Sequence, residues 1–136
     1  MSKKRVLILC TGNSCRSIMA EALVNAELGE CIEADSSGVD ASGKVNTIAQ
    51  ALLEQEGLWR DEYHSKRLES VIDNDYDLII TVCDHAKESC PTFPKPIPKI
   101  HIGFEDPTGK EKDAYLHTLQ GIRARLIPML KKMLCS

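Results

Sequence analysis

Three cysteines, one arginine and one aspartate in this chain are spaced in a way that suits nucleophilic and redox chemistry. Cys10 and Arg16 lie in one loop that follows an apolar run, and Cys83 and Cys90 follow a second such run. Asp106 stands before a proline, after a third run. A thiolate can attack an oxyanion that an arginine binds, and a carboxylic acid can protonate the oxygen that leaves. Further thiols can then supply two electrons.

Residues 10–17, Cys-Thr-Gly-Asn-Ser-Cys-Arg-Ser, have the composition of an anion-binding loop. A loop that enters a helix directs unpaired N–H groups at one point, which the helix dipole makes electropositive. Gly12 lets the backbone curl around an anion, and Asn13 tolerates left-handed geometry. We expect this field to lower the pKa of Cys10 by several units and Ser17 to donate its hydroxyl to the thiolate. The predicted oxyanion site comprises Thr11, Gly12, Asn13, Ser14, Cys15, Arg16 and Ser17.

Cys83 and Cys90 lie seven positions apart, a spacing that decides between two chemistries. The separation is about 10 Å in a helix, whereas a disulfide needs Cα atoms about 4.4–6.8 Å apart. The spacing therefore favours a conditional disulfide, which a hydrolase does not need and a reductase does. Two alternatives remain open: the two cysteines are buried without a role, or they form a zinc site with His85, although the usual ligand spacing is missing.

The elements that must position these residues alternate between strand and helix. We predict strands over 4–9, 31–34, 77–82 and 99–103, helices over 17–28, 47–56 and 112–134, a short helix over 68–72, and a partly helical loop over 83–90. Pro128 should kink or break the last helix. The order predicts one α/β domain, residues 1–136, with a four-stranded parallel sheet, helices on both faces and a ligand beyond the carboxyl ends of the strands.

Composition excludes several classes of protein. The 136 residues carry 17 Lys and Arg against 20 Asp and Glu, a net charge of −3, which argues against a nucleic-acid-binding surface. The apolar runs are too short to span a membrane, so we expect a soluble, cytoplasmic chain, and a monomer. Of the six cysteines, Cys15 is expected to be packed in the loop, and Cys31 and Cys135 to be structural or incidental.

The loop from Cys10 to Ser17 resembles the phosphate-binding loop of low-molecular-weight protein tyrosine phosphatases, and the resemblance extends over essentially the whole chain. Arsenate reductases that descend from those phosphatases share the loop. Cys83-x6-Cys90-Pro91 and the segment 101–110 look like the corresponding parts of thioredoxin-coupled arsenate reductases.

This resemblance implies a role for each candidate residue. Cys10 is the nucleophile, Arg16 and the loop amides bind the oxyanion, and Asp106 is the general acid, with a pKa raised by the bound dianion. Cys83 then attacks the Cys10 adduct, and Cys90 attacks Cys83. The resulting Cys83–Cys90 disulfide is reduced by thioredoxin, and no cofactor is needed.

Two rival functions stay open at this stage. One is a low-molecular-weight phosphatase that hydrolyses phosphomonoesters, but Thr108-Gly109-Lys110 stands where phosphatases carry aromatic residues, and the chain has only 6 aromatics. The other is a non-catalytic module that senses oxyanions or redox state. Some relatives bind potassium beside the loop, and Asn13, Glu21 and Ser36 match that pattern. Lys66-Arg67 stands where the fourth ligand, an aspartate, is expected, so we assign no metal.

Overall fold

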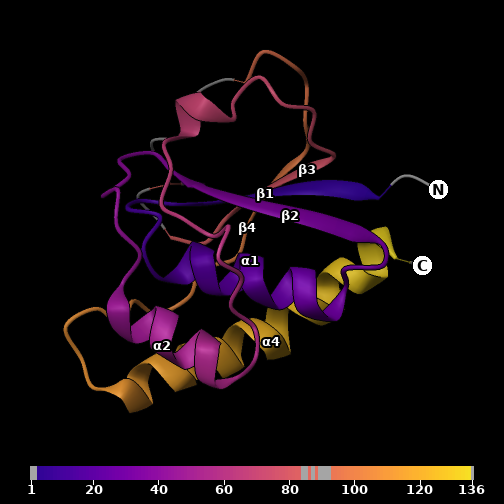
Figure 1. Ribbon diagram of the computed structural model, residues 1–136. Coiled ribbons are helices and arrows are strands. Elements are labelled where there is room, and N and C mark those ends of the chain that lie inside the picture. Colours follow the sequence, from indigo (N-terminus) through magenta and orange to yellow (C-terminus); the bar gives the residue numbers. More distant parts are fainter. Residues whose placement is uncertain (1–2, 84–85, 87, 89–92, 136) are drawn as a thin grey trace.

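Four parallel strands form the centre of the computed structural model, which describes residues 3–83, 86, 88 and 93–135 (Figure 1). They are β1 (Lys4–Cys10), β2 (Ile32–Gly38), β3 (Leu78–Thr81) and β4 (Lys99–His101), in the spatial order β2-β1-β3-β4. All neighbouring strands pair in parallel, which confirms the predicted sheet. Central β1 is buried from Val6 to Cys10, because helices and loops cover both faces of the sheet.

The helices lie on both sides of this sheet. In Figure 1, α1 (Arg16–Glu27), α2 (Thr47–Gln55) and α4 (Lys112–Leu134) lie on one side, and the short 3₁₀ helix η1 (Leu68–Ser70) lies on the other. Asn46 caps α2 by accepting hydrogen bonds from Ile48 N and Ala49 N. The fully buried residues of α4 recur every three or four positions and make one apolar stripe that faces the core: Tyr115, Leu119, Ile122, Leu126 and Leu130.

Two elements differ clearly from the prediction, and β4 and η1 each end two residues earlier than predicted. Strand β2 continues four residues beyond the predicted 31–34, because Asp35 to Gly38 pair with Leu7 to Cys10 of β1, and this pairing outweighs their turn propensity. Helix α4 continues through Pro128 without a break. Pro128 is exposed, so the helix loses one hydrogen bond on its solvent side while buried Ile127 and Leu130 keep their packing.

The sheet register brings the predicted functional segments to one edge. Cys10 pairs with Gly38, and Leu9 pairs with Thr81, which in turn pairs with His101. The loop after β1, Cys83 after β3 and the segment after β4 therefore leave the sheet at the same carboxyl edge. This is where ligands bind in parallel sheets.

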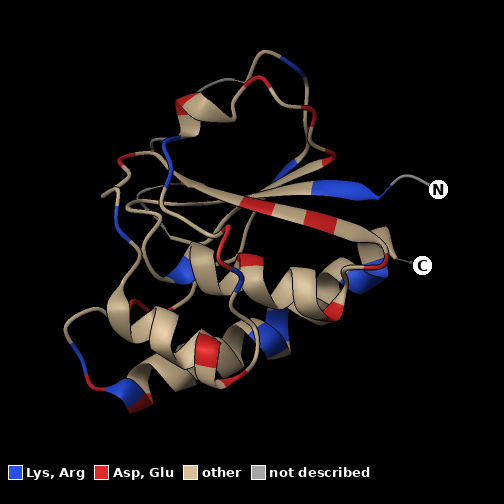
Figure 2. Cartoon of the chain, viewed as in Figure 1, with Lys and Arg blue, Asp and Glu red and all other residues tan. Residues whose placement is uncertain are grey.

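Basic and acidic side chains are interspersed along the helices and connecting segments (Figure 2). This arrangement agrees with the small net charge of −3. Within the described part of the chain, every helix is too short or too polar to cross a membrane.

Candidate active site

The loop between β1 and α1 turns its carbonyl groups outward and leaves its N–H groups open. Three loop carbonyls accept hydrogen bonds from the segment that follows β2: Thr11 O from Asp40 N, Gly12 O from Ser42 N and Ser14 O from Asn46 N, at 2.8–2.9 Å. No described residue accepts from the N–H groups of residues 12–17, and α1 has no side-chain cap. Several donors at a helix N-terminus are therefore free for one oxyanion.

Asn13 holds the shape of this loop from inside. Its φ of 49° is left-handed, as its residue type predicts. Its Nδ2 donates to Ser17 Oγ at 2.8 Å and to Ser36 Oγ at 2.9 Å, and its Oδ1 accepts from Lys66 N at 2.8 Å. Ser17 Oγ accepts from Asn13 and keeps its own proton, so the donation from Ser17 to Cys10 stays a prediction.

Arg16 joins the loop to the segment that carries Asp106. Its Nη1 donates to Phe104 O at 3.0 Å, and its Nη2 lies 3.6 Å from Asp106 Oδ2. Burial raises the pKa of Asp106, but hydrogen bonds from Thr108 and the charges of Arg16 and Lys110 together hold it below its usual value. The predicted rise in the pKa of Asp106 applies when a dianion is bound in the loop, and it stays a prediction.

Helix α4 positions the segment before Asp106, which is a role that the sequence analysis missed. Thr118 Oγ1 donates to Glu105 O at 3.2 Å, and Arg125 Nη1 donates to Gly103 O at 2.9 Å. The Arg125 guanidinium also lies 4.9 Å from the centroid of the Phe104 ring. Arg16 donates to Phe104 O, so the carbonyl groups of residues 103, 104 and 105 each accept a hydrogen bond from a side chain. The sequence carries no signal for these contacts, because Thr118 and Arg125 read as ordinary residues of an amphipathic helix.

Cys83 lies beside Cys10. Each thiol shifts the pKa of the other, and Oγ1 of Thr11, the residue next to Cys10, lies 3.2 Å from Cys83 Sγ. Cys10 is 4% exposed and Cys83 5%. This proximity follows from the sheet, since Cys10 ends β1 and Cys83 follows its neighbour β3.

The two thiols compete for one negative charge. The interaction with Cys83 and burial raise the pKa of Cys10, although Arg16 lowers it. The interaction with Cys10, with hydrogen bonds from Thr11 and the Ala86 N–H, lowers the pKa of Cys83 to about 5. The direction for Cys10 is opposite to the fall expected from the loop alone, because a second sulfur competes for the charge.

The remaining predicted thiols have different surroundings. Cys15 is buried in the loop, as expected, and burial raises its pKa to about 12. Cys90, His85 and Lys87 lie outside the described residues. The geometry therefore bears on Cys10 and Cys83 and leaves the role of Cys90 and the zinc alternative as predictions.

Glu21, behind the loop, lies in the site that the resemblance assigns to potassium. Ser36 donates to Glu21 Oε1 at 2.7 Å and accepts from Asn13, so the three predicted residues form one buried network. Burial raises the pKa of Glu21 to about 7, and the charge of Lys66 lowers it. Lys66 thus supplies a positive charge where the relatives' pattern has a carboxylate.

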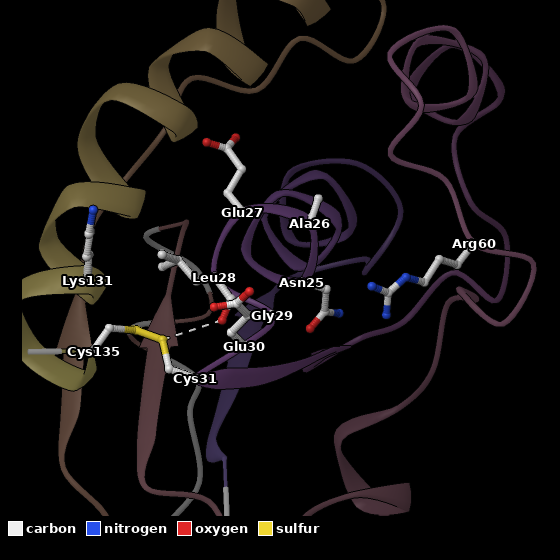
Figure 3. A pocket seen from close by; sticks show the side chains of 10 residues that line it. All are labelled: Asn25, Ala26, Glu27, Leu28, Gly29, Glu30, Cys31, Arg60, Lys131 and Cys135. Atoms are coloured by element: carbon white, nitrogen blue, oxygen red, sulfur yellow. Dashed lines mark hydrogen bonds between the residues drawn. A yellow bond between two sulfur atoms is a disulfide. The ribbon is translucent and has the colours of Figure 1, made fainter.

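Cys31 and Cys135 are joined in a disulfide at the opposite end of the sheet, with Cα atoms 5.8 Å apart (Figure 3). The sequence analysis described both as structural or incidental and did not pair them. No spacing rule links residues 104 positions apart.

The comparison with protein families decides where this chain belongs. The model of the low molecular weight phosphotyrosine protein phosphatase family matches residues 5–134. The chain belongs to this family. The resemblance inferred from the loop, and the fold that it implies, are thereby confirmed.

Within the family, the similar proteins include arsenate reductases. The chain is 41% identical over 125 residues to an arsenate reductase of Brevibacillus brevis, which covers 92% of both chains. It superposes on the crystal structure of arsenate reductase from Archaeoglobus fulgidus with a TM-score of 0.79, 34% identity and coverage of 92% and 98%. A structure of an arsenate reductase in the phosphate binding state gives a TM-score of 0.77, 27% identity and coverage of 95% and 98%.

Proposed function

We propose that this member of the family is an arsenate reductase that works through a relay of Cys10, Cys83 and Cys90. The observation that carries the proposal is the position of Cys83 beside Cys10, at a loop of free N–H groups. A phosphatase needs one sulfur at the anion, whereas reduction of arsenate consumes two electrons and needs a second sulfur within reach of the first.

The first step binds and activates the oxyanion. Arsenate occupies the loop between the open N–H groups and Arg16. The N–H groups of the loop and Arg16 stabilise negative charge beside Cys10. The proton of the Cys10 thiol therefore passes to Cys83, and Cys10 becomes the thiolate. The Cys10 sulfur then bonds to arsenic, and an oxygen leaves as water after taking a proton from Asp106.

The second step transfers the electrons. After the Cys83 thiol loses its proton to water, its sulfur attacks Cys10 Sγ and the sulfur–arsenic bond breaks. The electron pair of that bond stays on arsenic, which leaves as arsenite, while Cys10 and Cys83 are oxidised to a disulfide. The position of Cys83 supports this step, since its sulfur lies 3.2 Å from Oγ1 of Thr11, the residue next to Cys10.

The third step resets the enzyme. Cys90 attacks Cys83 Sγ, which releases Cys10 as a thiolate and leaves a Cys83–Cys90 disulfide. A dithiol, for which thioredoxin is our proposal, reduces that disulfide with two electrons and two protons. The support for this step is the sequence pattern Cys83-x6-Cys90-Pro91. We further propose that the protein acts in the cytoplasm and as a monomer.

The relay is tested by arsenate-dependent NADPH oxidation with thioredoxin and thioredoxin reductase. Cys10→Ser and Cys83→Ser should show no turnover, and Cys90→Ser should release about one arsenite per chain and then stop. Cys135→Ser is the matched control, because it removes a sulfur at the other end of the sheet and should turn over normally. Sustained turnover by Cys90→Ser would refute the relay.

The phosphatase alternative is separated by the same variants. The loop that binds arsenate also fits phosphate, so a weak hydrolysis of aryl phosphate is expected in the unmodified chain. Cys83→Ser should keep that hydrolysis while it loses arsenate reduction. Loss of both activities in this variant, or of neither, would contradict the separate roles proposed for Cys10 and Cys83.

A further inference from the structure

A second pair of sulfurs lies far from the loop. Cys31 immediately precedes β2 and Cys135 immediately follows α4, and their disulfide ties the end of the last helix to the edge of the sheet (Figure 3). Gly38, at the other end of β2, pairs with Cys10. Seven residues of strand span about 20 Å, so this pair is outside the relay.

The pair is accessible to small molecules. Both cysteines are half-buried and line a cavity of about 610 Å³, with Arg60 and Lys131 among the other lining residues. Figure 3 shows the disulfide at the wall of this cavity. A small dithiol can therefore attack one of its sulfurs and release both as thiols, with transfer of two electrons and two protons to the protein.

Reduction leaves two thiols that the fold holds together. Cys31 is fixed at its strand, where its N–H donates to Leu28 O at 3.0 Å. Cys135 lies one residue beyond the last turn of α4, so small rotations there change the separation of the sulfurs. The Cα distance of 5.8 Å keeps both sulfurs within reach of one bridging atom.

We propose that the reduced Cys31–Cys135 pair is a binding site for trivalent arsenic. This inference rests on the proposed function, because arsenite is the product of the relay. Soft thiolate ligands favour soft, thiophilic centres, and arsenious acid condenses with two thiols. Two sulfur–arsenic bonds replace two arsenic–oxygen bonds, two waters leave, and no atom changes oxidation state. The third arsenic oxygen faces the open cavity.

The arsenic bridge has a structural consequence. It restores the covalent link between α4 and β2 that reduction removes, so product and disulfide stabilise the same fold. Helix α4 also holds the segment before Asp106 through Thr118 and Arg125. Bound arsenite is thus held at the C-terminal end of α4, the helix that positions the predicted acid Asp106.

The test removes the relay and keeps the pair. The full-length triple variant Cys10→Ser, Cys83→Ser, Cys90→Ser retains Cys15, Cys31 and Cys135. After reduction by a phosphine and removal of the reductant, arsenite is added and the intact mass is measured. We expect about one arsenic per chain, and a melting temperature about 5 °C above that of the arsenic-free reduced variant.

Further substitutions in that background assign the site. Added Cys135→Ser or Cys31→Ser should abolish both the mass increase and the thermal shift, whereas added Cys15→Ser should leave both unchanged. Arsenic retained without Cys135, or none retained by the reduced triple variant, would overturn the proposal.

A measurement on the unmodified chain covers the case in which the triple variant fails to fold. Arsenite should protect Cys31 and Cys135 from alkylation in the reduced chain, as read by peptide mapping, and no protection of these two residues would overturn the proposal. Neither experiment depends on turnover, so a failed relay and a failed arsenic site give different results.

Discussion

At the scale of single residues, the thiol pair makes the protonation of one sulfur depend on the other. Cys10, Thr11 and the Ala86 N–H all lower the pKa of Cys83. Arg16 lowers the pKa of both thiols. A bound oxyanion brings negative charge close to both thiols. Which of the two sulfurs holds the proton therefore depends strongly on the neighbouring groups.

Replacement of Thr11 by Val should raise the pKa of Cys83, because the side chain keeps its shape and loses the hydroxyl that lies 3.2 Å from the sulfur. The rate of Cys83 alkylation by iodoacetamide, followed by peptide mapping from pH 4 to 9, reports this pKa. The midpoint should shift upward by about one pH unit. Thr47→Val, on α2, is the control and should give the unmodified profile. An unchanged midpoint in Thr11→Val would show that the hydroxyl does not stabilise the thiolate.

Glu21 should make stability depend on pH. Its pKa is raised from 4.5 to about 7 in the folded chain by burial, so the folded state holds a proton that the unfolded state has released. The contribution of Glu21 to the free energy of unfolding should be highest below about pH 4.5, fall by roughly 3 kcal/mol as the pH rises to about 7, and then level off.

Urea denaturation at several pH values measures this slope, with Glu21→Gln as the comparison. The amide cannot ionise, so this variant should lack the contribution between pH 4.5 and 7. If both proteins gave the same pH profile, Glu21 would not be the proton-binding group.

At the scale of elements, the parallel strands act as a frame and the segments that follow them act as the site. β1 ends in Cys10, Cys83 follows β3, and the segment after β4 carries Asp106. The last of these is the least regular, and its position depends on side chains of other elements, namely Arg16 of α1 and Thr118 and Arg125 of α4.

Arg125→Ala should lower kcat for arsenate about tenfold with little change in KM, because the segment that orients Asp106 loses its donor to Gly103 O and its contact with the Phe104 ring. Arg125→Lys should recover part of the loss. Arg123→Ala is the matched control, since Arg123 lies on the same helix and pairs with the exposed Glu27. Steady-state kinetics and the melting temperature separate positioning from stability. A normal kcat in Arg125→Ala would show that Thr118 and Arg16 hold the segment without it.

At the scale of the whole molecule, α4 packs on α1 and supplies much of the core on that side of the sheet. Its C-terminal end is also linked to β2 by the disulfide, which closes a loop of 104 residues. A link of this length stabilises a fold by about 4–5 kcal/mol when it acts on the entropy of the unfolded chain. The helix is therefore held both by packing and by a covalent bond.

Leu119→Ala should lower the free energy of unfolding by about 2–5 kcal/mol, because the side chain is fully buried and its removal leaves a cavity. The neighbouring exposed residue provides the control, and Gln120→Ala should change stability by less than about 0.5 kcal/mol. Urea denaturation of both variants under one fixed redox condition measures the difference. Equal stability of the two variants would contradict the packing of α4 described above.

The sequence by itself determined the parts of this protein that depend on neighbours in the chain. The apolar run before Cys10 predicts β1. The glycine and the asparagine of the loop predict the anion site, and the residue pattern of 112–134 predicts α4. These patterns depend on local conformation and on burial of one face, so they can be read from short segments. The family resemblance, carried by the same motifs, was confirmed by the comparison over residues 5–134.

Only the tertiary structure decided the properties that arise between distant residues. The proximity of Cys83 raises the pKa of Cys10 and lowers its own, contrary to the expectation from the loop alone. The contacts of Arg125 and the bond between Cys31 and Cys135 join residues 22 and 104 positions apart. The reason is physical: a pKa, a hydrogen bond and a disulfide depend on distance and burial in space, which no local pattern of residue types encodes.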